Sequence, residues 1–209
     1  MNILFPIAGL GTRFKKSGYT DPKPFVKFRG KPLLEWSISS LRLPGKYYVI
    51  VNGLEEQYIK ILEDIKTKYF LDLDIIDIKQ STRGQAETCL IAIKEFNINT
   101  EDQLIITNCD QFTPWNPYKF EAFLRENQPD GLVSTYNHLN VELGKESPYS
   151  HVEIGDDGYA KHLTEKFATS KLSLNGIFYW KKCQLFVDSA EEMMKDNSEL
   201  GWGSGAFSS

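Results

Sequence analysis

The sequence predicts an α/β fold in which a mostly parallel, mixed sheet carries helices on both faces. Three observations indicate this class. Short apolar runs alternate with helical stretches along most of the chain. The connections between them are short, as they are in sheets built from strand–helix–strand units. An apolar run, Ile3–Phe5, lies almost at the first residue, and two glycines follow it where a strand should turn.

Each predicted element is indicated by an apolar run, by the spacing of apolar residues or by the residue that precedes it. The helix beginning at Leu33 comes directly after Pro32, and residues 55–68 place apolar side chains on one helical face. Apolar runs bounded by turn residues give the strands. We expect strands over residues 2–6, 47–51, 73–78, 103–107, 131–136, 149–154 and 174–179. We expect helices over residues 33–41, 55–68, 84–96, 117–127 and 183–194.

The composition is that of an ordinary globular chain. With 209 residues, 41% of them hydrophobic, it can bury one sizeable core, and we expect a single domain over residues 1–200. Residues 201–209 are rich in Gly and Ser and are interpreted as a frayed tail, a truncated end or a cloning remnant. No apolar segment approaches the roughly 20 residues of a membrane span, and no signal peptide is recognised.

The cysteines are Cys89, Cys109 and Cys183, odd in number and widely spaced. They match neither a zinc site nor a disulfide framework, so we expect reduced thiols and a cytoplasmic location.

The segment from Pro6 to Pro24 predicts a polyphosphate site. Gly9 and Gly11 free the backbone at the end of the first strand, so that N–H groups can surround an anion. Arg13 and Lys23 add two cations beside this turn.

The charge distribution supports an anionic small-molecule ligand. Residues 1–31 carry a net positive charge, although the whole chain has a net charge of −4. A basic patch on an acidic protein can steer such a ligand. Nucleic acid is the competing partner, but it usually requires a basic face spread over more of the domain. The cations of this segment are Arg13, Lys15, Lys16, Lys23, Lys27, Arg29 and Lys31, against the single anion Asp21.

Asp110 is the candidate metal ligand. The apolar strand over residues 103–107 delivers it at its carboxyl end, in the sequence I-I-T-N-C-D-Q. Mg²⁺ prefers carboxylate oxygen and usually keeps waters and phosphates as its other ligands, so one carboxylate can suffice. The structural alternative is an aspartate that closes a turn.

Two further segments are candidate binding elements. Gln80 offers an amide that can read a base edge, and Gly84 lets a ring approach the backbone at a helix start. Glu165 could hold sugar hydroxyls, and Lys166 could bind a phosphate. The structural alternative for Gln80 and Gly84 is a loop that enters a helix. The structural alternative for Glu165 and Lys166 is an exposed, solvated ion pair. Asn175-Gly176 could equally be a turn into a strand.

Taken in order, these segments resemble the nucleotidyltransferases that couple a nucleoside triphosphate to a sugar 1-phosphate, the glucose-1-phosphate thymidylyltransferase-like group. The resemblance covers roughly residues 1–195 and implies a GT-A-like domain with a Rossmann-like nucleotide-binding half. The motifs that carry it are A-G-L-G-T-R at 8–13, P-K-P at 22–24, G-K-P-L-L-E at 30–35, G-Q-A-E at 84–87, N-C-D-Q at 108–111, E-K at 165–166 and N-G-I-F-Y at 175–179.

The resemblance also implies roles for individual residues. Arg13, Lys23 and Asp110 would act in catalysis, and Asp110 would bind Mg²⁺. Residues that would contact the nucleotide are Ala8, Gly9, Leu10, Gly11, Thr12, Arg13, Lys23, Gln80, Gly84 and Gln85. Residues that would contact the sugar phosphate are Glu165, Lys166, Asn175 and Gly176. The substrate phosphate would attack the α-phosphorus and release pyrophosphate, giving an NDP-sugar for surface polysaccharide synthesis, and a homo-oligomer is expected.

Two departures from the family pattern are visible. The family often has G-T-A where this chain has Gly84-Gln85-Ala86. Family members also continue past the late helix into a region that supplies a second metal-binding carboxylate, whereas this chain has no acidic residue after Glu199. We therefore expect either an incomplete metal site or a longer natural enzyme.

Three other functions remain open. A cytidylyltransferase acting on a small phosphorylated alcohol such as phosphocholine would share the N-terminal half, with Tyr149, Tyr179, Trp180 and Glu165 available for a quaternary ammonium. A glycosyltransferase would use Asp110 in a D-x-D motif, but Asn108 stands at its first position. A nucleotide-sensing module would bind nucleotide without releasing pyrophosphate.

Overall fold

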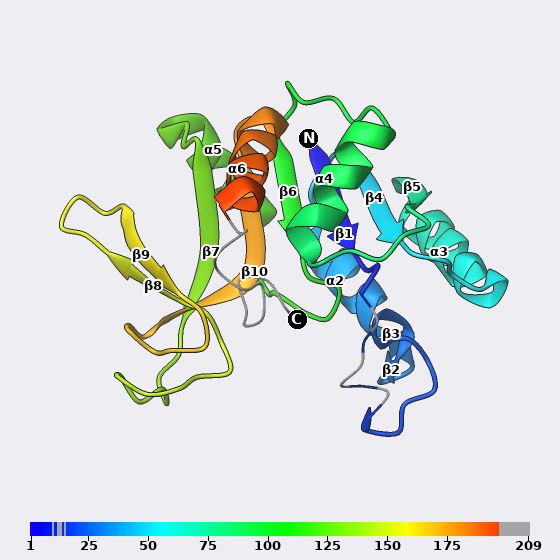
Figure 1. Ribbon diagram of the computed structural model, residues 1–209, viewed down its shortest axis with the longest axis horizontal. Helices are drawn as coiled ribbons and strands as arrows, with labels where there is room; N and C mark the ends of the chain where they lie inside the picture. Colours follow the sequence, from blue (N-terminus) through cyan, green and yellow to red (C-terminus); the bar gives the residue numbers. More distant parts are fainter. Residues whose placement is uncertain (10, 12–13, 15, 197–209) are drawn as a thin grey trace.

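The computed structural model describes residues 1–9, 11, 14 and 16–196. Leu10, Thr12, Arg13 and the predicted tail at 201–209 lie outside the described residues. Within the described part, one main sheet has eight strands in the order β5-β4-β1-β6-β10-β8-β9, with β7 also paired to β10 (Figure 1). No helix in these described ranges is long and apolar enough to cross a lipid bilayer.

The sheet has a parallel part and an antiparallel part. The parallel pairs join β1 (Asn2–Pro6), β4 (Lys46–Val51), β5 (Asp72–Asp77) and β6 (Leu104–Thr107). The antiparallel pairs join β10 (Leu172–Trp180) to β6, β7 (Gly131–Asn137) and β8 (His151–Ile154), and β8 to β9 (Ala160–Thr164). The predicted α/β class with a mixed sheet is confirmed.

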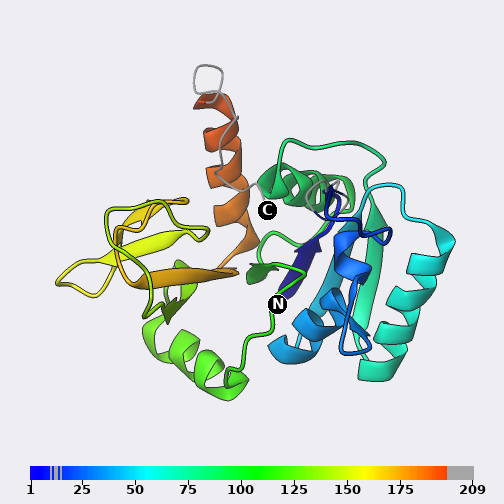
Figure 2. The same ribbon diagram turned by 90° about the horizontal axis from the view of Figure 1, so that it is seen from below.

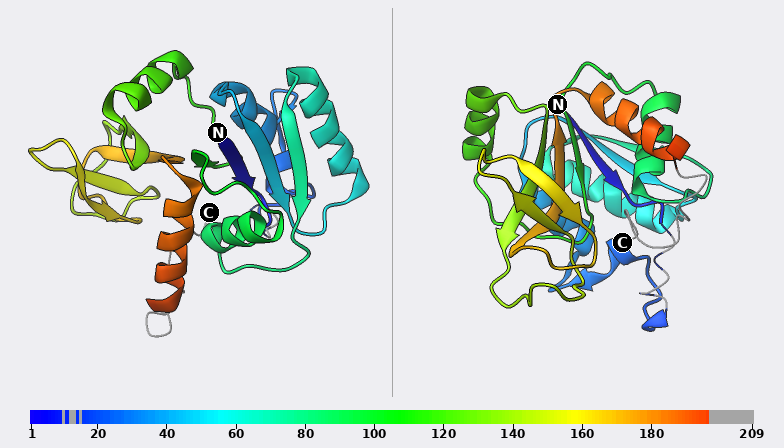
Figure 3. Two further views of the ribbon diagram at one scale, coloured as in Figure 1. Left: turned by 90° about the horizontal axis from the view of Figure 1, so that it is seen from above. Right: turned by 60° about the vertical axis from the view of Figure 1, so that its left-hand side comes forward.

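Helices cover both faces of the parallel part, as Figures 2 and 3 show. The helices α2 (Leu33–Leu41), α3 (Glu56–Tyr69) and α5 (Pro117–Asn127) contribute to one apolar core. A second core lies on the other face and includes side chains of α4 (Gln85–Glu95) and α6 (Cys183–Asp196). Successive side chains of β1 point to opposite faces of the sheet, so that Ile3 and Phe5 pack in the first core and Leu4 packs in the second.

The predicted elements are all present, with ends within two residues of those expected. The structure adds the 3₁₀ helix η1 (Lys23–Phe25) and a small hairpin of β2 (Lys27–Phe28) and β3 (Lys31–Pro32). It also adds β9, for which the sequence analysis predicted no element. Asn175-Gly176 is not a turn before a strand, as one reading had it, because both residues lie inside β10.

Candidate active site

The candidate site lies at the edge of the sheet where the parallel strands end. Their carboxyl ends share this edge, which is where ligands bind in open α/β sheets. The strand β10 runs antiparallel to β6, with Ile177 opposite Thr107. The residues of β10 that precede Ile177 therefore extend beyond the carboxyl end of β6, on the same side as Asp110.

Lys23 and Asp110 form an ion pair at this edge. Lys23 Nζ lies 3.0 Å from Asp110 Oδ2, and the two side chains are 18% and 31% exposed. The two residues that the sequence analysis assigned to phosphate and metal binding are thus brought together. Gly11 lies beside Lys23, because a Cβ built on Gly11 would be 3.7 Å from Lys23 Cβ. The glycine turn and the P-K-P segment therefore meet at one place.

Packing against α3 holds the P-K-P segment. Phe25, which is buried, packs against Tyr58 on α3 with the ring centroids 4.6 Å apart and the rings tilted. The Tyr58 hydroxyl donates a hydrogen bond to Asp21 Oδ1 at 2.9 Å. Burial, followed by the hydrogen bond to Asp21, raises the pKa of Tyr58 to about 12, so the hydroxyl keeps its proton at neutral pH. Lys23 is consequently fixed to the body of the domain.

Hydrogen bonds to α2 hold the loop that carries Asp110. Ser37 Oγ donates to the carbonyl of Asn108 at 2.6 Å, and the backbone N–H of Thr113 donates to Ser40 Oγ at 3.2 Å. Trp115 Nε1 donates to the carbonyls of Ser40 and Leu41 at 3.2 and 3.0 Å. The sequence analysis did not foresee these contacts, which fix the position of Asp110 after β6.

Burial keeps the Cys109 thiol protonated. Burial raises the pKa of its thiol to about 12, with the charge of Asp110 as a smaller cause. The thiol therefore stays protonated at neutral pH. All three cysteines are free, as expected from their spacing.

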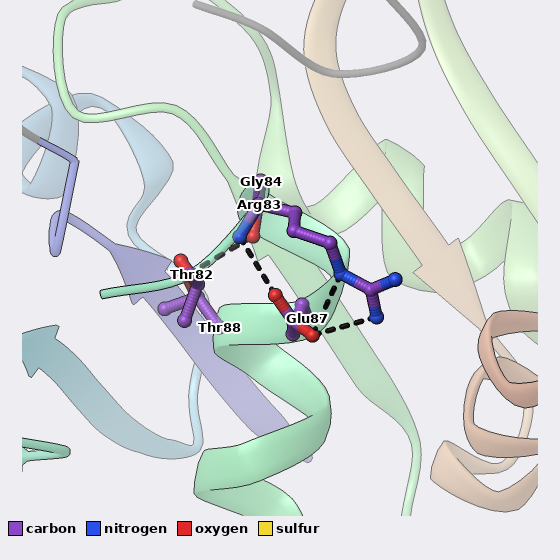
Figure 4. Close-up of polar contacts among 5 residues, drawn as sticks. All are labelled: Thr82, Arg83, Gly84, Glu87 and Thr88. Carbon is purple, nitrogen blue, oxygen red and sulfur yellow. Dashed lines mark hydrogen bonds and ion pairs between the residues drawn. The ribbon is translucent and has the colours of Figure 1, made fainter. Parts of the chain in front are cut away.

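The segment that enters α4 is held by its own side chains (Figure 4). Glu87 accepts hydrogen bonds from the backbone N–H of Arg83 at 2.7 Å, and from Arg83 Nε and Nη2 at 2.9 and 2.7 Å. The hydrogen bond from Arg83, more than the opposing burial, lowers the pKa of Glu87. Thr82 and Thr88 share a hydroxyl hydrogen bond of 2.7 Å. Glu87 of the G-Q-A-E motif therefore has a structural role at the helix start.

Gly84 leaves open space at the start of α4. It is the N-cap residue in an extended conformation, and a Cβ built on it would meet no atom within 4 Å. Packing within the described residues therefore does not require a glycine here, and approach of a ligand ring remains the prediction. Gln80 is exposed beyond the end of β5, and its contact with a base also stays a prediction.

Gln85 reaches the Asp110 loop. Its Nε2 donates to Asn108 Oδ1 at 3.2 Å, so this amide is directed at the loop after β6. Ala8 lies against the second core, and Gly9 is exposed. Their expected contacts with the nucleotide remain predictions.

Asn175 and Gly176 lie in an irregularity of β10. The pairing with β7 shifts between Leu174 and Phe178, so β10 bulges there. Asn175 Nδ2 donates to Ser134 Oγ at 3.0 Å, and Asn175 Oδ1 accepts from the backbone N–H of Ile177 at 3.3 Å. Gly176 has a φ of +74°, which favours glycine. Bulges of this kind re-aim side chains beside binding sites.

Glu165 and Lys166 follow β9 and form a half-exposed ion pair, with Lys166 Nζ 3.3 Å from Glu165 Oε1. The residue before them, Thr164, pairs with His151, which in turn pairs with Ser173 of β10. Glu165 is therefore level with the start of the β10 bulge, two strands across the sheet.

The aromatic residues considered for a quaternary ammonium separate into two groups. Tyr179 is 2% exposed in the core, and the Trp180 ring packs 5.1 Å from the ring of Phe186. Tyr149 is 42% exposed, with its ring 6.2 Å from that of Tyr136. Of the residues considered for such a box, Tyr149 and Glu165 remain accessible.

Gln111, the residue after Asp110, carries an unsatisfied polar atom. Its Oε1 is buried and has no hydrogen-bond partner in the described part of the chain. A buried acceptor without a donor is unfavourable. This atom was not singled out from the sequence, because nothing in a sequence shows whether a glutamine carbonyl is satisfied.

Comparison with known proteins identifies the class. The family model described as "Nucleotidyl transferase" matches residues 7–201. The chain is 24% identical over 161 residues to a probable mannose-1-phosphate guanylyltransferase of rice, Oryza sativa, a match that covers 75% of this chain and 42% of the relative. It spans less than half the length of the curated relatives it matches.

Solved structures show the same fold. A nucleoside-diphosphate-sugar pyrophosphorylase from Vibrio cholerae superposes with a TM-score of 0.75 at 21% identity, covering 92% of this chain and 78% of that one. An inositol-1-phosphate CTP transferase from T. maritima superposes with a TM-score of 0.65 at 15% identity, covering 97% and 75%. Because the family model covers most of the sequence, this chain belongs to the nucleotidyl transferase family.

Proposed function

We propose that this protein couples a nucleoside triphosphate to a sugar 1-phosphate and releases pyrophosphate. The product is an NDP-sugar, which we assign to surface polysaccharide synthesis. The observation that carries the proposal is the Lys23–Asp110 pair at the carboxyl edge of the sheet. It lies beside the glycine turn and on the same side as the β10 bulge with Asn175 and Gly176. Family membership agrees with this chemistry.

In the proposed reaction, a phosphate oxygen of the acceptor attacks the α-phosphorus of the nucleotide. The bond from the α-phosphorus to the oxygen bridging to the β-phosphate breaks, and pyrophosphate leaves with the electron pair. Such a step depends on positioning and charge neutralisation. Lys23 supplies a cation that is fixed by the packing of η1. A bound triphosphate offers Lys23 a second anionic partner besides Asp110.

The residues present fit a bound Mg²⁺. The Asp110 carboxylate is partly exposed and already accepts a cation at 3.0 Å. Among the described residues, no three His, Cys, Asp or Glu side chains gather into a metal-binding group. This suits an ion that takes its remaining ligands from phosphates and waters. Asp110 would hold Mg²⁺, which when bound would neutralise phosphate charge.

The remaining roles follow the same proposal. Gly11, Thr12 and Arg13 would bind the triphosphate, and Ala8, Gly9, Gln80 and Gly84 would contact the base. Glu165 and Lys166 would bind the acceptor with the β10 bulge.

A second candidate is a cytidylyltransferase that takes a small phosphorylated alcohol. It is favoured by the likeness of fold to the inositol-1-phosphate CTP transferase and by the exposed Tyr149 ring near Tyr136. A glycosyltransferase is less supported, because the first position of a D-x-D motif is occupied here by Asn108, a neutral amide. Its Oδ1 accepts a hydrogen bond from Gln85.

The test is pyrophosphate release, measured with Mg²⁺ for four nucleoside triphosphates against a panel of sugar 1-phosphates, inositol 1-phosphate and phosphocholine. Release with one sugar 1-phosphate supports the proposal and names both substrates. Release only with an alcohol phosphate supports the second candidate instead. Nucleotide binding without release from any pair would contradict both and favour a nucleotide-sensing module.

A further inference from the structure

Asn108 connects three elements around the candidate site. Its Oδ1 accepts from Gln85 Nε2 on α4, at 3.2 Å. Its backbone N–H donates to the carbonyl of Gly176 on β10 at 3.2 Å, and its own carbonyl accepts from Ser37 Oγ on α2 at 2.6 Å. Asp110 is two residues further along the same loop. One residue therefore links the nucleotide side, the acceptor side and the loop with the metal-binding candidate.

The contact with Gly176 is unusually close. A Cβ built on Gly176 would lie 2.1 Å from Asn108 Nδ2 and 2.8 Å from Asn108 Cγ. Both distances are too short for any side chain to fit without movement. The Asn108 amide cannot turn away without losing its hydrogen bond to Gln85. The close approach of the Asn108 amide and the left-handed backbone, with a φ of +74°, therefore both favour glycine at position 176.

This contact gives Gly176 a different explanation from the one that the sequence suggested. A glycine in the acceptor segment was expected to lie beside a bound sugar phosphate. In the structure, the space where its side chain would be is filled by the amide of Asn108. The contact with Asn108 therefore favours glycine at this position independently of any ligand that binds nearby.

We propose that Asn108 is a positioning residue, which sets the separation between the β10 bulge and the loop carrying Asp110. The inference rests on the proposed function, because that separation would align the acceptor phosphate with the α-phosphorus. Small displacements of reacting groups cost large factors in rate. Asn108 would act through β10 and α4, without contacting the substrates.

A double-mutant cycle tests the inference. Gly176→Ala introduces a methyl group against the Asn108 amide and should lower kcat by about tenfold or more. Asn108→Ala should lower kcat by about tenfold, with the nucleotide Kd within about twofold of the wild type. In the Asn108→Ala background, Gly176→Ala should cost less than it does alone, because the amide is gone.

Backbone strain needs its own control. Gly158 has a φ of +81°, and a Cβ there would meet nothing within 4 Å. Gly158→Ala therefore measures the cost of the left-handed backbone alone, which should appear as a lower Tm with kcat unchanged. If Gly176→Ala does not fold, the double variant should regain folding, because the amide that clashes with the methyl group is gone. Circular dichroism would then measure the rescue in place of kcat.

The outcomes separate this inference from the function on which it rests. Independent effects at the two positions, or failure of the double variant to fold, would overturn the positioning role. So would a rise in nucleotide Kd that accounts for the whole loss of activity in Asn108→Ala. A wild-type chain that releases no pyrophosphate with any substrate pair would contradict the proposed function itself, and the positioning role with it.

Discussion

The parallel and antiparallel halves of the sheet are built differently. All of β1 and β6 is buried, and hydrogen bonds to α2 fasten the loop after β6. In contrast, β9 is almost wholly exposed, and the Glu165–Lys166 pair that follows it is half exposed. The buried, parallel half carries the groups that we assign to phosphate chemistry, and the more exposed half carries those that we assign to the acceptor. Substitutions in the two halves should therefore change different kinetic constants.

Lys23→Ala should give the largest effect. It removes the cation that neutralises phosphate charge and leaves Asp110 without its partner at 3.0 Å. We expect pyrophosphate release to fall by about 10²–10³-fold, the size of a lost electrostatic contact in an active site. Lys27→Ala, an exposed lysine on β2, is the matched control and should retain activity. Full activity of Lys23→Ala would remove Lys23 from the mechanism.

Asp110→Asn should have the next largest effect. The amide keeps the shape of the side chain but loses the charge that would hold Mg²⁺. We expect kcat to fall by about 10²-fold and the Mg²⁺ concentration for half-maximal rate to rise. Asp74→Asn removes a carboxylate of a surface ion pair on β5 and serves as the control. An unchanged Mg²⁺ requirement in Asp110→Asn would place the metal elsewhere.

Lys166→Ala examines the more exposed half. The acceptor KM should rise by about tenfold, while the nucleotide KM stays near the wild-type value, because a half-exposed charge contributes modestly to binding. Lys161→Ala, a substitution of an exposed lysine on β9, is the control and should leave both KM values unchanged. A rise confined to the nucleotide KM would show that the division between the halves is wrong.

Glu35→Gln should change stability with little effect on catalysis. Burial would raise the pKa of Glu35, but hydrogen bonds from Lys68 and Tyr69 outweigh it and lower the pKa below its ordinary value of 4.5. A lowered pKa stabilises the folded state above the unfolded pKa, and this contribution is lost as the pH falls through the folded pKa. The variant should therefore be less stable by about 1–2 kcal/mol at neutral pH.

Urea unfolding of the wild type and of Glu35→Gln measures this difference at two pH values. The difference should be largest near pH 7 and should shrink as the pH falls below 4.5, the ordinary pKa of a glutamate. If the difference in the free energy of unfolding is the same at both pH values, the charge of Glu35 does not contribute to stability.

The two halves also differed in how well the sequence predicted them. The run Ile3–Phe5 reads as a strand because it is buried on both faces. The strand β9, A-K-H-L-T, has almost no buried face and so no periodic signal. The strands β2 and β3 have two residues each, which is too short for any pattern.

The candidate site likewise has one part that the sequence predicted and one part that it did not. Lys23 and Asp110 stand in recognisable motifs beside predicted strands, and the structure brings them together. The hydrogen bonds of Asn108 to Gln85, Ser37 and Gly176 depend on how α4, α2 and β10 pack. Packing between distant elements has no local signature, so this connection could not be predicted from the sequence.

The place of β10 in the sheet also bears on how the chain is made. It is the last strand of the described residues, yet it pairs with β6, β7 and β8. During synthesis, β6 emerges from the ribosome well before this partner. The nascent parallel half therefore carries an unpaired strand edge until residue 180 is available, and such edges pair readily with other chains. Elongation across residues 108–180 is thus the stage at which this edge is open to misassembly.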